Sequence, residues 1–404
     1  MTGADYQQRS QARLGHLAES LNRETARWEE AAEEGEPLEK HHSQVFCLTR
    51  LLQTSLEDLS KLPRTELTEP ILDLHHVWDF FRSKLILRCL PQYRDFLDTA
   101  DELAWACYQP ALSAAGLPST VPPLVFLNRD AVPFAVARGS DYREFLPSGV
   151  RTRSGAEAVH RLPFPIIGVP WHQTEHLPGL LAVTHEVGHH IEDDCELTAA
   201  LEARLRGSGL PASQQTVWRG WLGEVFADVC ACLACGPAYV ETLSDALVTA
   251  PVQAVGAYPP RDLRLRVCRA VLEPTEPNPP DEAAAVVQAL TTGGYAEFGD
   301  QTLPTVLRCT ESLNTKLAAG YLLAGLPSQA RDARAALAAA ATAFTQDPAR
   351  YDDLCVEPRV THEVLALRPD GLRAVQPAPP AATDRAATVG HLLAELLSPR
   401  TAER

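Results

Sequence analysis

Apolar residues recur every three to four positions along most of this chain, which is the spacing of an amphipathic helix. In the first third of the chain, Pro or Gly separates these periodic stretches, so each stretch is expected to form one helix. We expect the helices to pack antiparallel through short loops. The four predicted N-terminal helices cover residues 4–33, 45–62, 71–90 and 93–112.

The pattern changes at Pro118, where short apolar runs bounded by turn residues replace the helical spacing. Three such runs, at residues 121–127, 131–137 and 163–170, are typical of β-strands. The third run contains several prolines, which cannot donate to a strand ladder. We therefore expect it to be an edge strand, to which an extended peptide could add as one more strand.

Helical spacing then returns and continues to the end of the sequence. The pattern as a whole predicts a mostly helical α+β fold with a small sheet. We expect three regions: an N-terminal helical region at 1–117, a core at 118–272 that contains the strands, and a C-terminal helical region at 273–404. The further predicted helices cover residues 197–205, 214–235, 239–247, 260–272, 281–290, 303–326, 328–344 and 386–397.

Composition limits the classes of partner. The chain has 404 residues, and its net charge of −16 argues against nucleic acid and against anionic membrane surfaces. No apolar run approaches the ~20 residues that span a bilayer, and the first ten residues lack the apolar core of a secretory signal. Ten scattered cysteines suit free thiols in a reducing compartment. We therefore expect a cytoplasmic protein that does not bind membranes.

A metal-ligand motif follows the third predicted strand. Residues 185–189 read His-Glu-Val-Gly-His. On a helix, His185 and His189 lie one turn apart on one face, so both imidazoles can reach the same ion. Glu186 is rotated by about 100° from His185 and can hold a water bound to that ion. Such a five-residue motif also occurs by chance, so the rest of the chain must supply the remaining ligand.

The third ligand is expected on a second helix. Glu224 and Asp228 stand four residues apart in an otherwise apolar stretch, 35 residues after His189. Buried carboxylates need a compensating charge, and a cation would supply it. Glu224 can coordinate the ion while Asp228 accepts a hydrogen bond from one of the two imidazoles, which would fix that ring. The small residue Ala227 would allow the two helices to approach closely.

This arrangement resembles the gluzincin zinc peptidases, whose signature is His-Glu-x-x-His followed by a helix with Glu-x-x-x-Asp. The Glu-x-x-Ala-Asp form at Glu224–Asp228 is locally similar to HtpX and to the CAAX-prenyl-peptidase-like families. Those families have a downstream His-Pro-x-x-x-x-Arg segment, which residues 258–264 match at Pro259 and Arg264 but not at Tyr258. Their transmembrane helices are also missing. The resemblance covers residues 160–272 and implies a zincin-like core with one Zn²⁺ per chain.

The mechanism that follows is hydrolysis of peptide bonds. Zinc held by His185, His189 and Glu224 would lower the pKa of its bound water. Glu186 would accept the proton of that water and later deliver it to the leaving amine. The developing oxyanion needs a protein donor besides the zinc. The candidate donors are Tyr258, which we favour, and Arg264, His172, His176 and Tyr142.

Two other functions remain open. The chain could be a catalytically silent scaffold or sensor that keeps zinc for stability, but a silent protein would have no need of Glu186. It could also be a zinc hydrolase of non-peptide amides. The substrate is otherwise expected to be a protein or peptide, and the flanking helical regions could bind a regulatory partner. Three cysteines near Asp228 are expected to be buried core residues: Cys230, Cys232 and Cys235.

Overall fold

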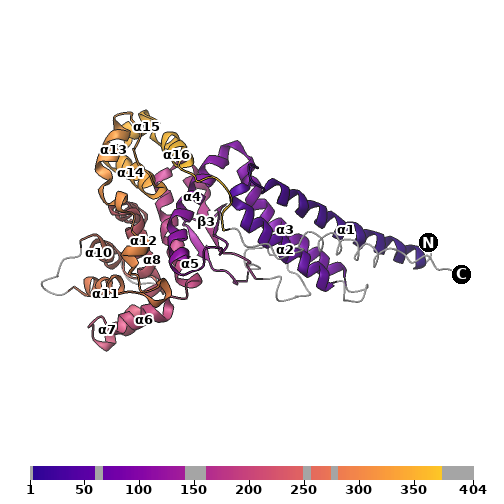
Figure 1. The fold of residues 1–404 in the computed structure, drawn as a ribbon, viewed down its shortest axis with the longest axis horizontal. Coiled ribbons are helices and arrows are strands. Elements are labelled where there is room, and N and C mark those ends of the chain that lie inside the picture. Colours follow the sequence, from indigo (N-terminus) through magenta and orange to yellow (C-terminus); the bar gives the residue numbers. More distant parts are fainter. Residues whose placement is uncertain (1–2, 60–66, 142–160, 249–255, 274–280, 375–404) are drawn as a thin grey trace. The chain divides into compact units, whose positions relative to one another are not determined.

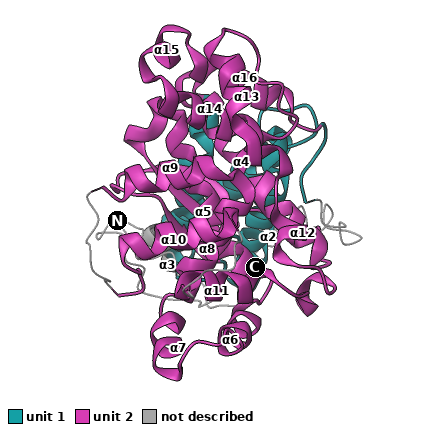
Figure 2. Cartoon of the chain, turned by 90° about the vertical axis from the view of Figure 1, so that its left-hand side faces the viewer, with its two compact units in different colours: residues 1–89, 138–164, 370–404 teal, residues 90–137, 165–369 magenta. Residues whose placement is uncertain are grey.

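A computed structural model describes residues 3–59, 67–141, 161–248, 256–273 and 281–374 (Figure 1). The chain divides into two compact units, which Figure 2 shows in different colours. The first unit comprises Met1–Cys89, Arg138–Phe164 and Asp370–Arg404, and the second comprises Leu90–Ala137 and Pro165–Pro369. The units group the chain differently from the three regions proposed from the sequence, whose boundaries remain a prediction.

The first unit is built from three long helices that contact one another pairwise. They are α1 (Gly3–Ala31), α2 (His42–Leu59) and α3 (Thr68–Leu85). Their apolar stripes supply a buried core, and the ring of Trp28 meets the ring of Trp78 edge-on with a centroid distance of 5.5 Å. These are three of the four predicted N-terminal helices. Short 3₁₀ turns at Glu39–His41 and Ile86–Cys89 flank them.

The second unit contains a three-stranded mixed sheet with the strand order β1-β3-β2. Strand β3 (Ile166–Pro170) pairs in parallel with β1 (Leu124–Asn128) and antiparallel with β2 (Phe134–Val136). The expectation that the third strand lies at an edge is therefore wrong. Its prolines do not interrupt the ladder: Pro165 precedes the strand and accepts a hydrogen bond from Leu124, and Pro170 ends it.

The fourth predicted helix, α4 (Pro91–Ala114), belongs to this second unit, where it packs against α5 (Ala182–Asp194) and β1. Two other predicted helices are each divided into two. The 214–235 stretch breaks near Gly220, and the 303–326 stretch contains a 3₁₀ turn at Thr310–Asn314. The predicted helix at 386–397 lies outside the described residues. Two helices near the C-terminal end, α15 and α16, were not predicted.

The remaining helices of the second unit include α5 and α8, which carry the predicted metal ligands and pack against each other. A mostly helical α+β fold with a small sheet is thus confirmed. No helix in the described part of the chain is long and apolar enough to cross a membrane. These helices are α5 (Ala182–Asp194), α6 (Thr198–Arg206), α7 (Ala212–Arg219), α8 (Leu222–Cys235), α9 (Pro237–Ala246), α10 (Arg261–Leu272), α11 (Glu282–Thr291), α12 (Leu303–Leu307), α13 (Thr315–Leu323), α14 (Ala333–Gln346), α15 (Pro348–Asp353) and α16 (Val356–Ala366).

Candidate metal site

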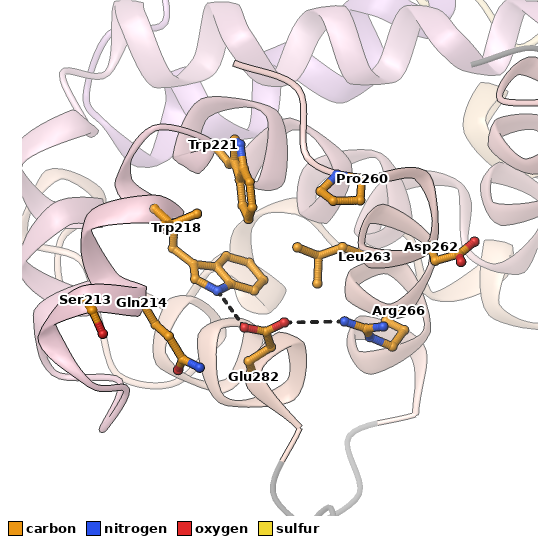
Figure 3. A pocket seen from close by; sticks show the side chains of 10 residues that line it. Ser213, Gln214, Trp218, Trp221, Pro260, Asp262, Leu263, Arg266 and Glu282 are labelled. Carbon is orange, nitrogen blue, oxygen red and sulfur yellow. Dashed lines mark hydrogen bonds and ion pairs between the residues drawn. The ribbon is translucent and has the colours of Figure 1, made fainter. Parts of the chain in front are cut away.

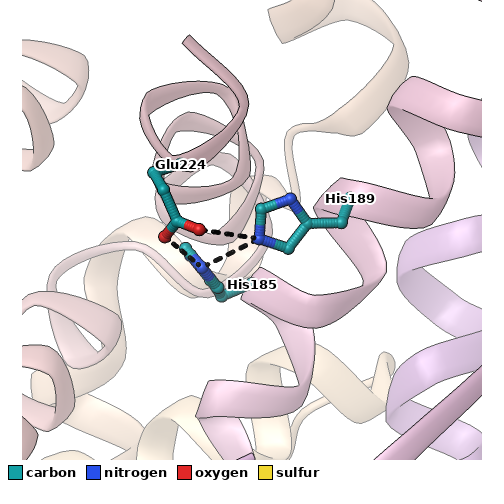
Figure 4. A group of neighbouring side chains, drawn as sticks. All are labelled: His185, His189 and Glu224. Atoms are coloured by element: carbon teal, nitrogen blue, oxygen red, sulfur yellow. Dashed lines mark hydrogen bonds and ion pairs between the residues drawn. The ribbon is translucent and has the colours of Figure 1, made fainter. Parts of the chain in front are cut away.

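Two packed helices bring His185, His189 and Glu224 together, as Figure 4 shows. The Nε2 atoms of the two histidines on α5 are 3.3 Å apart. On α8, Glu224 places Oε2 3.3 Å from Nε2 of His185 and Oε1 3.6 Å from Nε2 of His189. Two imidazole nitrogens and a carboxylate therefore converge on one point.

The close approach of α5 and α8 depends on Gly188, which lies between the two metal-site histidines. A Cβ atom at this position would lie only 2.7 Å from Cα of Ala227 and 3.1 Å from its Cβ. Real Cβ atoms do not approach backbone carbon this closely, so only glycine fits without a shift of the helices. Ala227 was predicted to let the two helices approach closely, and the structure places it against Gly188.

The three side chains fit a bound cation. Oε2 of Glu224 is buried and has no hydrogen-bond partner among the described residues, although Nε2 of His185 lies 3.3 Å away. An unsatisfied buried carboxylate oxygen is costly, and coordination to a cation would satisfy it. Nitrogen and carboxylate oxygen are both donors that divalent metal ions accept. His185, His189 and Glu224 could therefore hold a metal ion.

Asp228 lies behind the ligands at the centre of a buried polar cluster. Its Oδ1 is 2.9 Å from Nδ1 of His185 and accepts a 2.7 Å hydrogen bond from the hydroxyl of Tyr239. Arg264 donates to both carboxylate oxygens, from Nε to Oδ2 at 2.8 Å and from Nη2 to Oδ1 at 2.7 Å. In the neutral imidazole of His185, an Nδ1–H that donates to Asp228 leaves on Nε2 the lone pair that a metal needs.

The electrostatics of this cluster keep Asp228 ionised. Burial would raise the pKa of its carboxyl group, but the charge and hydrogen bonds of Arg264 outweigh burial and lower this pKa. Burial would lower the pKa of His185, yet the hydrogen bond to Asp228 and its charge raise it to about 9. Burial and the neighbouring His185 lower the pKa of His189 to about 4. The carboxylate of Asp228 is therefore a permanent negative charge against His185.

A pocket of about 780 Å³ opens beside the three ligands and is lined by residues of β2, α5, α9 and α10. Glu186 lines this pocket, and burial raises the pKa of its carboxyl group, as a general base requires. Tyr258 also lines it with a half-exposed side chain, and the negative charge of Glu224, followed by burial, raises the pKa of its hydroxyl group. Tyr258 therefore offers a protonated donor near the ligands.

The other candidate oxyanion donors have different surroundings. Arg264 lines the pocket but is bound to Asp228, so its guanidinium positions that carboxylate. His172 and His176 are exposed in and after a 3₁₀ turn, Trp171–Glu175, and neither is among the residues that line the pocket. The ring of His176 packs edge-on against Phe344. Tyr142 lies outside the described residues.

Tyr239 is the residue of this cluster that the sequence did not indicate. It lies on α9, which begins directly after Gly236 reverses the chain at the end of α8. Gly236 has φ of 61° and ψ of −146°, and a Cβ atom there would overlap with the carbonyl oxygen of Ser312. This turn directs Tyr239 back onto Asp228. The Gly236-Pro237 pair marks the turn in the sequence, but no spacing rule predicts the contact that results.

The cysteines near the site are free and mostly buried. Three of them lie on α8 and are buried, in agreement with the interpretation that they are core residues: Cys230, Cys232 and Cys235. Burial raises the pKa of the Cys230 and Cys235 thiols well above the ordinary value. These two thiols therefore stay protonated and are poor metal ligands or nucleophiles.

A second pocket, of about 530 Å³, lies between α7, α10 and the start of α11 (Figure 3). Its wall includes the rings of Trp218 and Trp221, which meet edge-on. Glu282 accepts a hydrogen bond from Nε1 of Trp218 at 3.3 Å and lies 3.5 Å from Nη2 of Arg266. Both carboxylate oxygens of Glu282 are therefore engaged by neighbouring side chains.

Comparison with known proteins adds no family: no family model, no curated protein and no solved structure matches this chain. The function of this chain is therefore inferred from the geometry of the site.

Proposed function

We propose that this chain is a zinc-dependent metallopeptidase of the gluzincin type. The observation that carries the proposal is the spacing of the ligand atoms. The two histidine Nε2 atoms lie 3.3 Å apart, Oε2 of Glu224 lies 3.3 Å from that of His185, and Oε1 of Glu224 lies 3.6 Å from that of His189. Tetrahedral zinc with ligands at 2.0–2.1 Å requires neighbouring ligand atoms to be about 3.3–3.4 Å apart. His185, His189 and Glu224 would hold the ion and leave a fourth position for water or substrate.

The residues around the ligands support hydrolysis rather than a purely structural zinc site. Zinc, when bound, lowers the pKa of water and polarises a carbonyl group. Glu186 is in the pocket, and its carboxylate would accept a proton from the attacking water and return it to the leaving nitrogen. Tyr258 would donate a hydrogen bond to the oxyanion of the substrate. A silent scaffold would need neither a buried carboxylate in the pocket nor an open cavity.

A peptide substrate is supported by the position of β2. This strand is the outer strand next to β3, and Phe134 and Ala135 line the same pocket as the ligands. Among the described strands, β2 pairs with β3 alone, so its outer edge is available for an extended peptide. The sequence led us to expect peptide binding at the third strand, and we now propose the second strand, β2, instead. A small non-peptide amide would use little of this edge.

The test is Glu186→Gln in protein loaded with zinc. The variant should retain about one zinc per chain and lose cleavage of a peptide library by about a hundredfold or more. Zinc content measured by atomic spectroscopy and cleavage measured by mass spectrometry give the two readings. Full cleavage by the variant would remove Glu186 from the reaction. Cleavage of small amides alone would favour the non-peptide hydrolase.

A further inference from the structure

The pocket beside the ligands contains a guanidinium group that forms no ion pair with the carboxylates of the described residues. Arg261, the first residue of α10, lines this pocket, and its buried Nε has no hydrogen-bond partner. Within the described part of the chain, Arg261 forms no ion pair. Arg264, one turn later, differs because Asp228 neutralises it. The guanidinium of Arg261 is therefore a cation in the pocket that is not paired with any described side chain.

The position of Arg261 is also unfavourable for the helix. The N-terminal end of a helix carries a partial positive charge, so a cation in the first turn is unfavourable. Asp262, the next residue, is the type of side chain that suits this position. An arginine that is unpaired and repelled by its own helix has no evident structural reason, and an anion brought by a ligand would compensate it.

The wall next to Arg261 is mostly apolar. The pocket is lined by one face of α9, because the contributing residues follow the spacing i, i+3, i+4, i+7 and i+8. Among them only Tyr239 and Thr242 carry a hydroxyl group. This part of the pocket thus combines an apolar surface with one cation. The residues of this face are Tyr239, Thr242, Leu243, Ala246 and Leu247.

We propose that Arg261 binds a carboxylate group of the substrate, so that the site selects peptides with a free carboxylate close to the scissile bond. A guanidinium binds a carboxylate through two parallel hydrogen bonds, which gives both affinity and orientation. The inference rests on the proposed peptidase function. Two sources share this chemistry: the α-carboxylate of a C-terminal residue, and the side chain of an internal Asp or Glu.

The experiment measures equilibrium binding of peptides to zinc-loaded Glu186→Gln protein, so that no cleavage is needed. One pair of peptide pools has a C-terminal leucine either as the free acid or as the amide. A second pair is amidated and contains either Glu or Gln at an internal position. We expect one of the two acidic pools to bind about ten- to a hundredfold more tightly than its neutral counterpart. The pair that shows this difference identifies the source of the carboxylate.

The preference should disappear when Arg261→Met is added, and Arg261→Lys should restore part of it, because lysine keeps the charge but loses the planar fork. Arg269→Met is the matched control, since Arg269 is an exposed arginine of the same helix outside the pocket. Zinc content and circular dichroism verify that each variant is folded. Equal binding of acidic and neutral pools, or a preference that survives Arg261→Met, would overturn the inference.

The outcomes separate this inference from the proposed function. Cleavage of acidic and neutral peptides at equal rates would contradict the role of Arg261 and leave the peptidase intact. A carboxylate preference in binding, with no cleavage of any pool by the wild type, would contradict the peptidase and support the carboxylate site. Absence of both binding and cleavage would contradict both proposals.

Discussion

The guanidinium of Arg264 binds the carboxylate of Asp228 through two hydrogen bonds of 2.7 and 2.8 Å, and neither side chain is exposed to any large extent. Asp228 in turn lies 2.9 Å from Nδ1 of His185. The orientation of a proposed metal ligand is therefore set by an ion pair between α8 and α10. This pairing makes the stability of the fold and the affinity for metal depend on the same residues.

Replacement of Arg264 by methionine should destabilise the protein by about 3–5 kcal/mol, because Asp228 would keep a buried charge without its partner. Chemical denaturation measures the change in the free energy of unfolding. The double variant Arg264→Met/Asp228→Asn should recover part of this loss, since no unpaired charge remains. Arg269→Met, on the exposed face of α10, is the control. If the loss in the free energy of unfolding of the double variant equals the sum of the losses of the two single variants, the ion-pair explanation is contradicted.

Asp228→Ala should weaken the affinity for zinc by about 10–100-fold, because the ring of His185 loses the carboxylate that orients it. Competition with a chromophoric chelator gives the dissociation constant. Asp262→Ala, which removes an exposed carboxylate from α10, should leave this constant unchanged. If the affinity of Asp228→Ala equals that of the wild type, the carboxylate does not act on the metal site.

Zinc should stabilise the folded protein, because it binds the assembled ligands of α5 and α8 more tightly than the unfolded chain. Zinc at about 100 times its dissociation constant should add about 2.7 kcal/mol to the free energy of unfolding. Thermal unfolding with zinc and with chelator measures the effect. In Glu224→Ala the difference between the two conditions should nearly vanish. The same stabilisation in that variant would place the zinc elsewhere.

Tyr239→Phe should lower the free energy of unfolding by about 1 kcal/mol, since one hydrogen bond to Asp228 is lost while Arg264 keeps the carboxylate paired. Tyr351→Phe is the matched control: its hydroxyl is buried without a hydrogen-bond partner, so its removal should be neutral or slightly stabilising. Equilibrium unfolding of both variants tests the difference. Equal effects would mean that the hydroxyl of Tyr239 contributes nothing to the cluster.

Gly188→Ala should destabilise the protein by about 1–3 kcal/mol, because the added methyl group would push α5 away from Ala227 of α8. It should also weaken zinc binding, since the separation of the helices moves Glu224 from the histidines. Gly320→Ala is the control, as this helical glycine of α13 has open space around it. That substitution should be neutral or stabilising because alanine favours helices. If Gly188→Ala is as stable as Gly320→Ala, the two helices can separate without a loss of stability.

The predictable parts of this fold are those that depend on local spacing. The motif at residues 185–189 indicated α5, and helical periodicity indicated the segment that contains α8. The four-residue spacing within each helix placed His185 with His189 and Glu224 with Asp228. The centre of the sheet was mistaken for an edge because prolines at the ends of a strand look the same in a sequence as prolines within it. Tyr239 could not be found, because its contact depends on how tightly the chain turns at Gly236.

The turn at Gly236 also shows which parts of the chain are needed to form the site. Only glycine fits at position 236, because its backbone lies against the carbonyl of Ser312. One turn earlier, the carbonyl of Leu233 accepts a hydrogen bond from the backbone N–H of Cys309. Helix α14 also contacts α8 and α9. Residues more than 100 positions after the His-Glu-x-x-His motif therefore hold α8 and α9 in the positions that bring the polar cluster together. A fragment that stopped at residue 272 would keep every proposed ligand and lose the surface that shapes them.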